Sequence, residues 1–262
     1  MLGQRLSVVL CAIACACSPV LGRDLHPNAQ RYNVKAFSFA GGIPLRIMPL
    51  GASITHGVAS SDGNGYRQDL RQHIVDMGNA VNMVGSNPNG TMKDNDNSGW
   101  PGFIIDEVHT KSNADTPKYK PNLVLINLGT NDAIRNIDIP KAGERMQSMI
   151  TDIYTQSPQA TVVLSGLIRN AESGAQERGV QINSQYQSLV STLQKAGKPI
   201  IFADMQGLDG PLPSDLAPDG IHPVDKGYQK MANIWYKAIG QADSKGFLKK
   251  AENNGLPDDG AA

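Results

Sequence analysis

Cysteine is missing from almost the whole of this 262-residue chain. Its three cysteines, Cys11, Cys15 and Cys17, lie close together near the start, and none follows. The rest of the chain therefore has neither disulfides nor thiol chemistry available to it, and its core has to hold without cross-links.

An excess of charge of either sign is also lacking. Lys and Arg together number 24, and so do Asp and Glu, which gives a formal net charge of zero. A chain with balanced charges lacks the excess of positive charge that attracts nucleic acid or an anionic membrane. Aromatic residues make up only 5% of the sequence, but 40% of it is hydrophobic. That is enough to bury a core, and the length favours one large α/β domain.

Long hydrophobic runs are absent apart from one near the start. Arg5 precedes the apolar run Leu6–Cys17, and the small residue Gly22 follows. The run is shorter than the roughly 20 residues that a membrane-spanning helix needs. The pattern predicts a secretory signal peptide over residues 1–22 and an extracellular protein. The alternative is a lipoprotein signal with Cys15 or Cys17 lipidated.

Apolar strand-like runs then alternate with longer amphipathic stretches. Strands are expected at Leu45–Leu50, Ala80–Val84, Leu123–Leu128, Thr161–Ser165 and Pro199–Ala203, and helices at Tyr66–Met77, Pro140–Tyr154, Gly174–Ala196 and Asp225–Ile239. Buried strands joined by crossover helices predict an α/β fold with a doubly wound, five-stranded parallel sheet. We expect an irregular lead-in over 23–42, one domain over 43–242, and a polar C-terminal tail over 243–262 that frays.

Polar residues follow several of these strands. Ser53 comes after the first strand, Gly85 after the second and Asn131 after the third, and Asp219 and His222 come well past the fifth. In a parallel sheet the active site lies at the carboxyl ends of the strands, so we expect these residues to converge there.

The types of these residues suit nucleophilic catalysis. A serine hydroxyl needs a base to remove its proton and a third group to orient that base. Asp219 is three residues before His222, so one loop can hold the carboxylate against one imidazole nitrogen while the other faces Ser53. Backbone N–H groups of Ser53 and Gly85 and the amide of Asn131 could form an oxyanion hole.

The sequence resembles the SGNH (GDSL-type) hydrolases, whose four name-giving residues are here Ser53, Gly85, Asn131 and His222. Within them it is most similar to carbohydrate esterase family 3, which is acetyl xylan esterase-like. The supporting blocks are Arg46–Gly51, Gly65–Arg67, Val84–Ser86, Ser98–Trp100, Gly129–Asp132 and Asp219–Pro223. The resemblance implies a three-layer α/β/α, flavodoxin-like fold. It also implies metal-independent, cofactor-free removal of acyl groups, often acetyl, from polysaccharide.

One position departs from that family. Relatives usually have Asp directly before the nucleophile, where this chain has Ala52. The resemblance implies that such an Asp steadies the nucleophile loop, so its absence could loosen the oxyanion hole or alter substrate choice. The proposed triad does not use position 52, and we expect hydrolysis to survive.

Several of these residues have simpler interpretations. Ser53 could be a helix N-cap, Asn131 a turn residue, Gly85 a strand-ending glycine and His222 a surface histidine. His56 is a rival base without an evident carboxylate partner, and it could instead line the cleft. Asp132 is expected to be structural. Trp100 is either a sugar-stacking wall or buried packing.

Other motifs are weaker. Asn89 begins the one glycosylation sequon, which is usable only in a eukaryotic host. Asp94 and Asp96 could bind a cation, although a solvated loop is the better interpretation. The five histidines have no paired metal-binding spacing, so we expect no zinc site. No Gly-x-Ser-x-Gly elbow and no P-loop motif occur.

The sequence therefore predicts a secreted serine esterase that is a monomer and needs no cofactor. Its substrate would be an acylated carbohydrate or small ester, with no nucleic-acid or membrane partner. Two alternatives remain: a non-catalytic sugar-binding or interaction protein on a degenerate hydrolase scaffold, and a GDSL-type lipase.

Overall fold

The computed structural model describes residues 38–260, so the predicted signal peptide and most of the predicted lead-in lie outside the described residues. The described part contains six strands. They are β1 (Leu45–Gly51), β2 (Val81–Met83), β3 (Ser98–Gly99), β4 (Leu123–Asn127), β5 (Thr161–Ser165) and β6 (Ile200–Ala203). All five predicted strands are present within one or two residues of their expected bounds.

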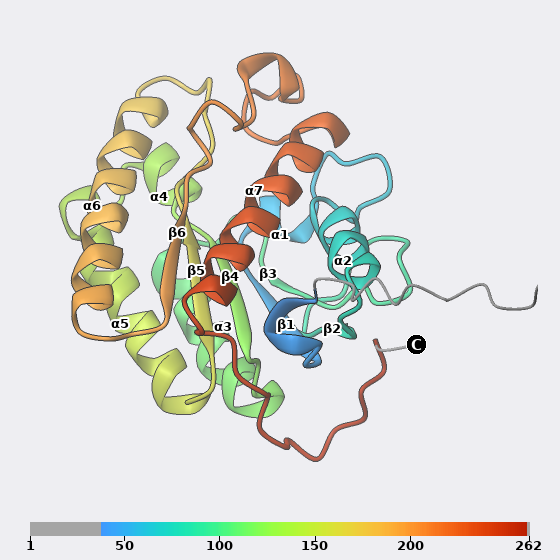
Figure 1. The fold of residues 1–262 in the computed structure, drawn as a ribbon. Helices are drawn as coiled ribbons and strands as arrows, with labels where there is room; N and C mark the ends of the chain where they lie inside the picture. Colours follow the sequence, from blue (N-terminus) through green and yellow to red (C-terminus); the bar gives the residue numbers. More distant parts are fainter. Residues whose placement is uncertain (1–37, 261–262) are drawn as a thin grey trace, which may run out of the picture. The chain divides into compact units, whose positions relative to one another are not determined.

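The strands form one parallel sheet in the order β2-β1-β4-β5-β6 (Figure 1). The short strand β3 pairs with the end of β1, beyond the stretch of β1 that pairs with β2. Hence β1 pairs with β4 on one side and with β2 and then β3 on the other. The order reverses beside β1, where the chain first builds outward to β2 and then returns to β4. Such a switch point is where α/β folds place their sites.

Seven α-helices connect and cover these strands. They are α1 (Ser53–His56), α2 (Arg67–Asp76), α3 (Ile105–Tyr119), α4 (Thr130–Arg135), α5 (Ala142–Gln156), α6 (Ala175–Lys195) and α7 (Asp225–Ser244). Three 3-10 turns, Phe39–Gly41, Ile139–Lys141 and Pro213–Asp215, complete the described elements.

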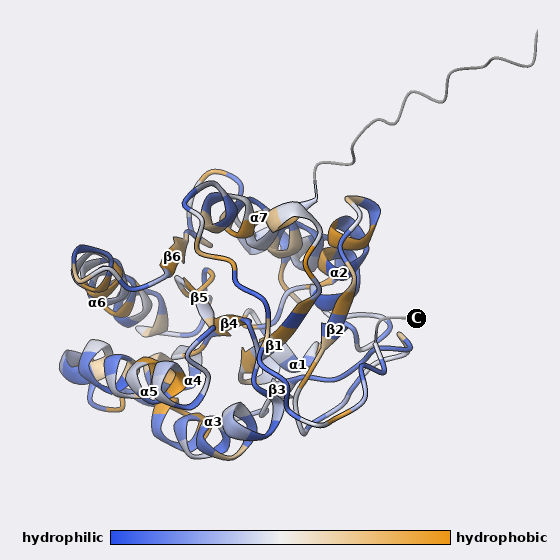
Figure 2. Ribbon diagram, turned by 60° about the horizontal axis from the view of Figure 1, so that its bottom comes forward, coloured by the Kyte–Doolittle hydropathy of each residue, from blue (hydrophilic) through white to orange (hydrophobic). Residues whose placement is uncertain are grey.

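Two apolar clusters fill the space between sheet and helices. Alternate residues of each central strand face opposite sides: Leu123 and Leu125 pack with α2 and α7, while Val124 and Ile126 pack with α3, α5 and α6. Figure 2 shows the hydrophobic strands lying between helices that keep hydrophilic residues on their outer faces. The predicted three-layer α/β/α fold is confirmed. Among residues 38–260, no helix is both long and apolar enough to cross a membrane.

Helix α3 and strand β3 were not predicted from the sequence. The buried face of α3 includes Ser112, Asp115 and Thr116, so its apolar stripe is too short to show a helical period. The hydroxyl groups of Ser112 and Thr116 form a hydrogen bond with each other, with their oxygens 3.2 Å apart. The Asp115 carboxylate accepts hydrogen bonds from the hydroxyls of Ser86 and Ser98. Polar burial of this kind is invisible to a search for apolar periodicity.

The predicted fraying of residues 243–262 is wrong for most of that segment. Helix α7 runs on to Ser244, and the following stretch lies along the domain through main-chain contacts. Arg46 donates to the carbonyl of Glu252 at 2.9 Å, Asn122 to that of Lys249 at 2.7 Å, and Thr161 to that of Phe247 at 2.9 Å. These contacts use backbone carbonyl groups, which are available whatever the side chains are, so the polar composition of the tail did not reveal them.

Candidate active site

Ser53 lies where β1 turns into the one-turn helix α1, of which it is the first residue. Its neighbours Ile54 and Thr55 are buried, whereas Ser53 itself is partly exposed. The turn is held by its own backbone, since the N–H groups of Gly57 and Val58 both donate to the Ser53 carbonyl at 3.0 Å. The hydroxyl is thereby presented at the carboxyl edge of the sheet from a fixed main chain.

Asp219 and His222 meet Ser53 as the spacing predicted. Nε2 of His222 is 2.8 Å from the Ser53 hydroxyl oxygen, and its Nδ1 is 2.7 Å from Oδ2 of Asp219. The other carboxylate oxygen of Asp219 accepts the backbone N–H groups of Ile221 at 2.9 Å and His222 at 3.0 Å. When Nδ1–H donates to the carboxylate, Nε2 is left to accept the serine hydroxyl proton.

The electrostatics of this group follow from its hydrogen bonds. Partial burial acts to raise the pKa of Asp219, but hydrogen bonds from the backbone and imidazole of His222 outweigh it and lower that pKa. The carboxylate therefore stays ionised near neutral pH. An ionised Asp219 holds the imidazole in the tautomer that can accept a proton from Ser53.

Asn131 is the second residue of α4, directly after β4. The preceding strand β4 pairs with β1, and the register places Asn127, the last residue of β4, opposite Gly51, the last residue of β1. Asn131 and Ser53 therefore both come a few residues after this pair. Its amide Nδ2 donates to the carbonyl of Phe103 at 2.8 Å. An amide group has two hydrogens, and this bond orients the group while using only one.

The missing side chain of Gly85 leaves room for the protein's own chain. A side chain there would meet the backbone of Asn97 at 2.1 Å and of Ser98 at 2.5 Å. The absent side chain therefore makes room for the segment that leads into β3, and not for a substrate. The glycine beside the nucleophile is Gly99 of β3, whose own Cβ would lie 2.6 Å from the His56 nitrogen and 3.0 Å from the Ala52 carbonyl oxygen. This Cβ contact does not bear on the direction of the Gly85 N–H, whose part in the oxyanion hole stays a prediction.

His56 is not the base. Its ring lies 3.5 Å from Nδ2 of Asn87, and no carboxylate pairs with it among residues 38–260. Burial lowers the pKa of His56, although hydrogen bonds with Asn97 and Gly99 oppose this shift. The imidazole bonded to Ser53 is that of His222, so the structure selects between the two histidines.

Trp100 is engaged in packing. Its ring stacks on Phe103 with centroids 5.9 Å apart, and the Lys111 ammonium lies 4.3 Å from its centroid. Its Nε1–H donates to the Ser98 hydroxyl at 3.3 Å. These contacts favour packing over sugar stacking, and they hold the segment whose Phe103 carbonyl orients Asn131.

Arg67 is fully buried and links the loops behind the nucleophile. Its guanidinium donates to four carbonyl oxygens, those of Asn89 at 2.8 Å, Asn95 and Gly63 at 2.9 Å, and His56 at 3.2 Å. Burial lowers the pKa of Arg67. The guanidinium nevertheless remains a cation, because the ordinary pKa of arginine lies far above neutral pH. The bond to His56 fixes the end of helix α1, one turn after Ser53.

Asn89 is structural in this fold. Both hydrogens of its amide are directed inward, to the carbonyls of His56 at 2.8 Å and Gly63 at 3.0 Å. A glycan on this nitrogen would remove at least one of these bonds, so the geometry speaks against the glycosylation prediction. Asp94 pairs with Arg71 at 2.8 Å. Within the described part, no group of three or more His, Cys, Asp or Glu side chains is arranged to hold a metal ion.

Asp132 is structural, as expected. It is fully buried, binds Nη1 of Arg145 at 2.7 Å and accepts the Ile105 backbone N–H at 3.1 Å. Burial raises the pKa of Asp132, and Arg145 opposes this shift. The ion pair joins α4 to α5 and to the start of α3, and so it fixes the helix that bears Asn131.

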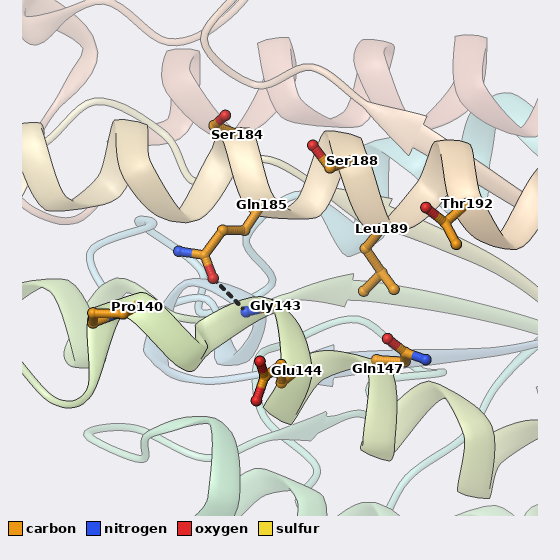
Figure 3. Close-up of a pocket in the computed structure, with 9 residues that line it drawn as sticks. All are labelled: Pro140, Gly143, Glu144, Gln147, Ser184, Gln185, Ser188, Leu189 and Thr192. Atoms are coloured by element: carbon orange, nitrogen blue, oxygen red, sulfur yellow. Dashed lines mark hydrogen bonds between the residues drawn. The ribbon is translucent and has the colours of Figure 1, made fainter.

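A separate hollow of about 320 Å³ lies between α5 and α6 (Figure 3). Glu144 and Gln147 line it from α5, and Ser184, Gln185 and Ser188 from α6. None of its lining residues belongs to the Ser53 group.

The family model described as GDSL-like Lipase/Acylhydrolase family matches residues 50–230, more than half of the chain. The matched range contains Ser53, Asn131, Asp219 and His222. The chain belongs to this family. The predicted SGNH (GDSL-type) membership is confirmed, and its resemblance to carbohydrate esterase family 3 agrees with the similar proteins found.

This GDSL-like chain is 30% identical to a multidomain esterase of Ruminococcus flavefaciens over 256 residues, which are 87% of this chain and 31% of that protein. The chain thus spans about a third of the length of that relative. A family 3 carbohydrate esterase of Clostridium thermocellum is similar with a TM-score of 0.70 and 26% identity, covering 77% of this chain and 98% of that one. A family 3 carbohydrate esterase from Talaromyces cellulolyticus (TM-score 0.67, 23% identity, 77% and 99% covered) shows the shared fold.

Proposed function

We propose that this protein is a serine esterase that removes acyl groups, chiefly acetyl, from carbohydrate. The observation that supports the chemistry is the continuous hydrogen-bonded series Asp219–His222–Ser53, with steps of 2.7 and 2.8 Å. Membership of an acylhydrolase family and likeness to carbohydrate esterases support the substrate class. The predicted signal peptide supports export, which completes the proposal of an extracellular enzyme.

The reaction would proceed through an acyl-enzyme. The Ser53 oxygen attacks the ester carbonyl while its proton passes to Nε2 of His222, and Asp219 stabilises the resulting imidazolium. The C–O bond to the sugar then breaks, and the leaving oxygen takes the proton from His222. Water, deprotonated by the same imidazole, then attacks the acyl-enzyme. The bond between the acyl carbon and the Ser53 oxygen breaks, the Ser53 oxygen takes the proton back from His222, and the acid leaves.

The tetrahedral intermediates need hydrogen-bond donors for their oxyanion. We assign this role to the Ser53 backbone N–H and to the second hydrogen of the Asn131 amide. The first hydrogen is held by Phe103 at 2.8 Å, so the amide is already oriented before substrate arrives. Preorganised donors need no reorganisation at the moment of reaction.

The test is Ser53→Ala with p-nitrophenyl acetate and a fluorophosphonate probe. We expect the wild-type protein to hydrolyse the ester and to be labelled at Ser53, and the variant to do neither while staying folded by circular dichroism. Ser188→Ala, in the hollow between α5 and α6, is the matched control and should behave as wild type. Sugar binding by a wild-type protein that neither turns over nor is labelled would instead establish the non-catalytic alternative.

The acyl group is tested separately with p-nitrophenyl esters of increasing chain length. We expect kcat/KM to be greatest for acetate and to fall for butyrate and octanoate. A maximum at octanoate would support the lipase alternative. Release of acetate from acetylated xylan, compared with acetylated chitin oligomers, would then identify the polysaccharide.

A further inference from the structure

Apart from the contact between His222 and Ser53, few hydrogen bonds join the tip of the Asp219–His222 turn to other segments. Asp219 has 44% of its side chain exposed. The base of the turn is held by the Leu216–Pro223 bridge and by the Ala217 N–H, which donates to the His222 carbonyl at 2.7 Å. These contacts lie at the base of the turn, whereas Gly220 and Ile221 form its tip.

A second loop contacts this tip. The N–H of Ala171 donates to the carbonyl of Gly220 at 2.8 Å, and Gly220 lies between the acid and the base. Among the hydrogen bonds of residues 38–260, no other backbone bond joins the tip to a distant segment. The loops also touch closely, because a Cβ on Gly220 would lie 2.6 Å from the Ala171 Cβ. The position of Ala171 therefore sets the position of Gly220.

Two side chains tie the loop of Ala171 to its surroundings. Arg169, within the loop, donates to the carbonyls of Pro211 at 3.1 Å and Gln206 at 2.7 Å, and Gln176 holds the part of the loop next to Ala171. The Gln176 Oε1, at the start of α6, accepts the backbone N–H of Asn170 at 2.9 Å. Its Nε2 donates to the side chain of Gln206 at 3.2 Å, and Gln206 follows β6. Gln176 thus connects α6, the loop after β5 and the loop after β6, and it is two hydrogen bonds away from Gly220.

We propose that Gln176 is a positioning residue for the Asp219–His222 turn. This inference rests on the proposed function for its kinetic consequence, but its structural consequence is independent of turnover. The side chain of Gln176 accepts the N–H of Asn170, and the N–H of the next residue, Ala171, donates to the carbonyl of Gly220. The turn is then held with its imidazole in line with Ser53. The hydrogen-bond partners of Gln176 are Asn170 and Gln206, and not Ser53, so we expect it to act on the rate of the chemical step and not on binding.

The kinetic experiment compares three variants. Gln176→Met keeps the side-chain length but removes the acceptor, and Gln176→Glu keeps an oxygen that can accept the Asn170 N–H. Gln185→Met is the matched control. Gln185 lies on the same helix and likewise accepts a backbone N–H, that of Gly143 at 2.9 Å, but in the hollow shown in Figure 3. We expect Gln176→Met to lower kcat about tenfold with KM within about twofold, since small misplacements of a catalytic group are costly. Gln176→Glu should recover most of the rate, and Gln185→Met should match wild type.

A proton NMR measurement tests the same idea without turnover. The Nδ1–H of His222, hydrogen-bonded to Asp219, should give a far-downfield resonance that Asp219→Asn removes. We expect Gln176→Met to broaden or remove this resonance through faster exchange with water, and Gln185→Met to leave it unchanged. If Gln176→Met behaves as Gln185→Met in both kcat and this resonance, the inference is wrong. If wild type shows no esterase activity but the resonance responds as expected, only the proposed function fails.

Discussion

The ion pair between Asp132 and Arg145 provides the sharpest prediction about stability. The Asp132 side chain is fully buried, whereas Arg145 is 13% exposed, and the two atoms that join them are 2.7 Å apart. With an effective dielectric constant of about 20, two unit charges at this distance attract by about 6 kcal/mol. Desolvation offsets much of this attraction, so the net value of the pair is small, but removing one partner leaves a charge buried without compensation.

The perturbation is Arg145→Leu, measured by urea unfolding at pH 8. Breaking a buried pair on one side costs about 3–5 kcal/mol, against a total of about 5–15 kcal/mol for a domain. With a slope of about 2–3 kcal/mol per molar urea, the unfolding midpoint should fall by about 1–2.5 M. Asp106→Asn is the control: Asp106 is 58% exposed and 3.4 Å from the same guanidinium, and its loss should cost at most about 1 kcal/mol.

The dependence on pH gives a second test of the same pair. Burial raises the folded-state pKa of Asp132 above its unfolded value, and Arg145 partly opposes the rise. A carboxyl group with a raised folded pKa costs stability above that pKa, and the cost disappears as the pH falls through it. Without Arg145 the pKa of Asp132 rises further. The penalty of Arg145→Leu should therefore shrink between pH 8 and pH 5. A penalty below about 1 kcal/mol at pH 8, or one equal at both pH values, would refute the reasoning.

Three further predictions concern the site. Asp219→Asn should lower kcat by between about a hundredfold and ten-thousandfold, because an amide can hold His222 in the wrong tautomer. Steady-state kinetics with p-nitrophenyl acetate measures this, and an unchanged kcat would count against the triad. Asn131→Ala should lower kcat about a hundredfold to a thousandfold with little change in KM, and a change confined to KM would argue for a binding role. Gly99→Ala should lower kcat and the urea midpoint, because its Cβ would lie 2.6 Å from a backbone nitrogen of α1. Gly179→Ala, with its nearest neighbour at 3.8 Å, should keep both, and equal behaviour of the two variants would disprove the close contact at Gly99.

The parts of the fold that the sequence predicted are those with apolar patterns. The runs Leu123–Leu128 and Thr161–Ser165 are buried on both faces, and such continuous runs identify strands of a parallel sheet. Helix α5 corresponds to the predicted helix Pro140–Tyr154, and its apolar residues at helical spacing are all buried: Met146, Met149, Ile150 and Ile153. Helix α3 lacks such a stripe, and β3 has only two residues in an Asn-rich loop. Both depend on polar contacts that form only in the folded protein.

The candidate site was predictable to a different degree for each residue. Asp219 and His222 are three residues apart, so local spacing determined their contact, and strand order placed Ser53 nearby. For Gly85, a glycine after a strand indicates only that something approaches closely, and not what approaches. Here the neighbour is the chain itself, at Asn97. The part played by Gln176 had no sequence signal, since its partners are backbone groups of another loop.

Ala52, where related enzymes usually have Asp, can be understood from the same main-chain contacts. Its side chain is 5% exposed and belongs to the apolar cluster beneath the site, so it offers nothing to the nucleophile turn. Its carbonyl instead accepts the His56 N–H at 3.0 Å, and the carbonyl of Gly51 accepts the Trp100 N–H at 2.9 Å. The turn is therefore held from both sides by backbone hydrogen bonds. Because these bonds need no side chain at position 52, the 2.8 Å contact between Ser53 and the imidazole is kept with alanine in that place.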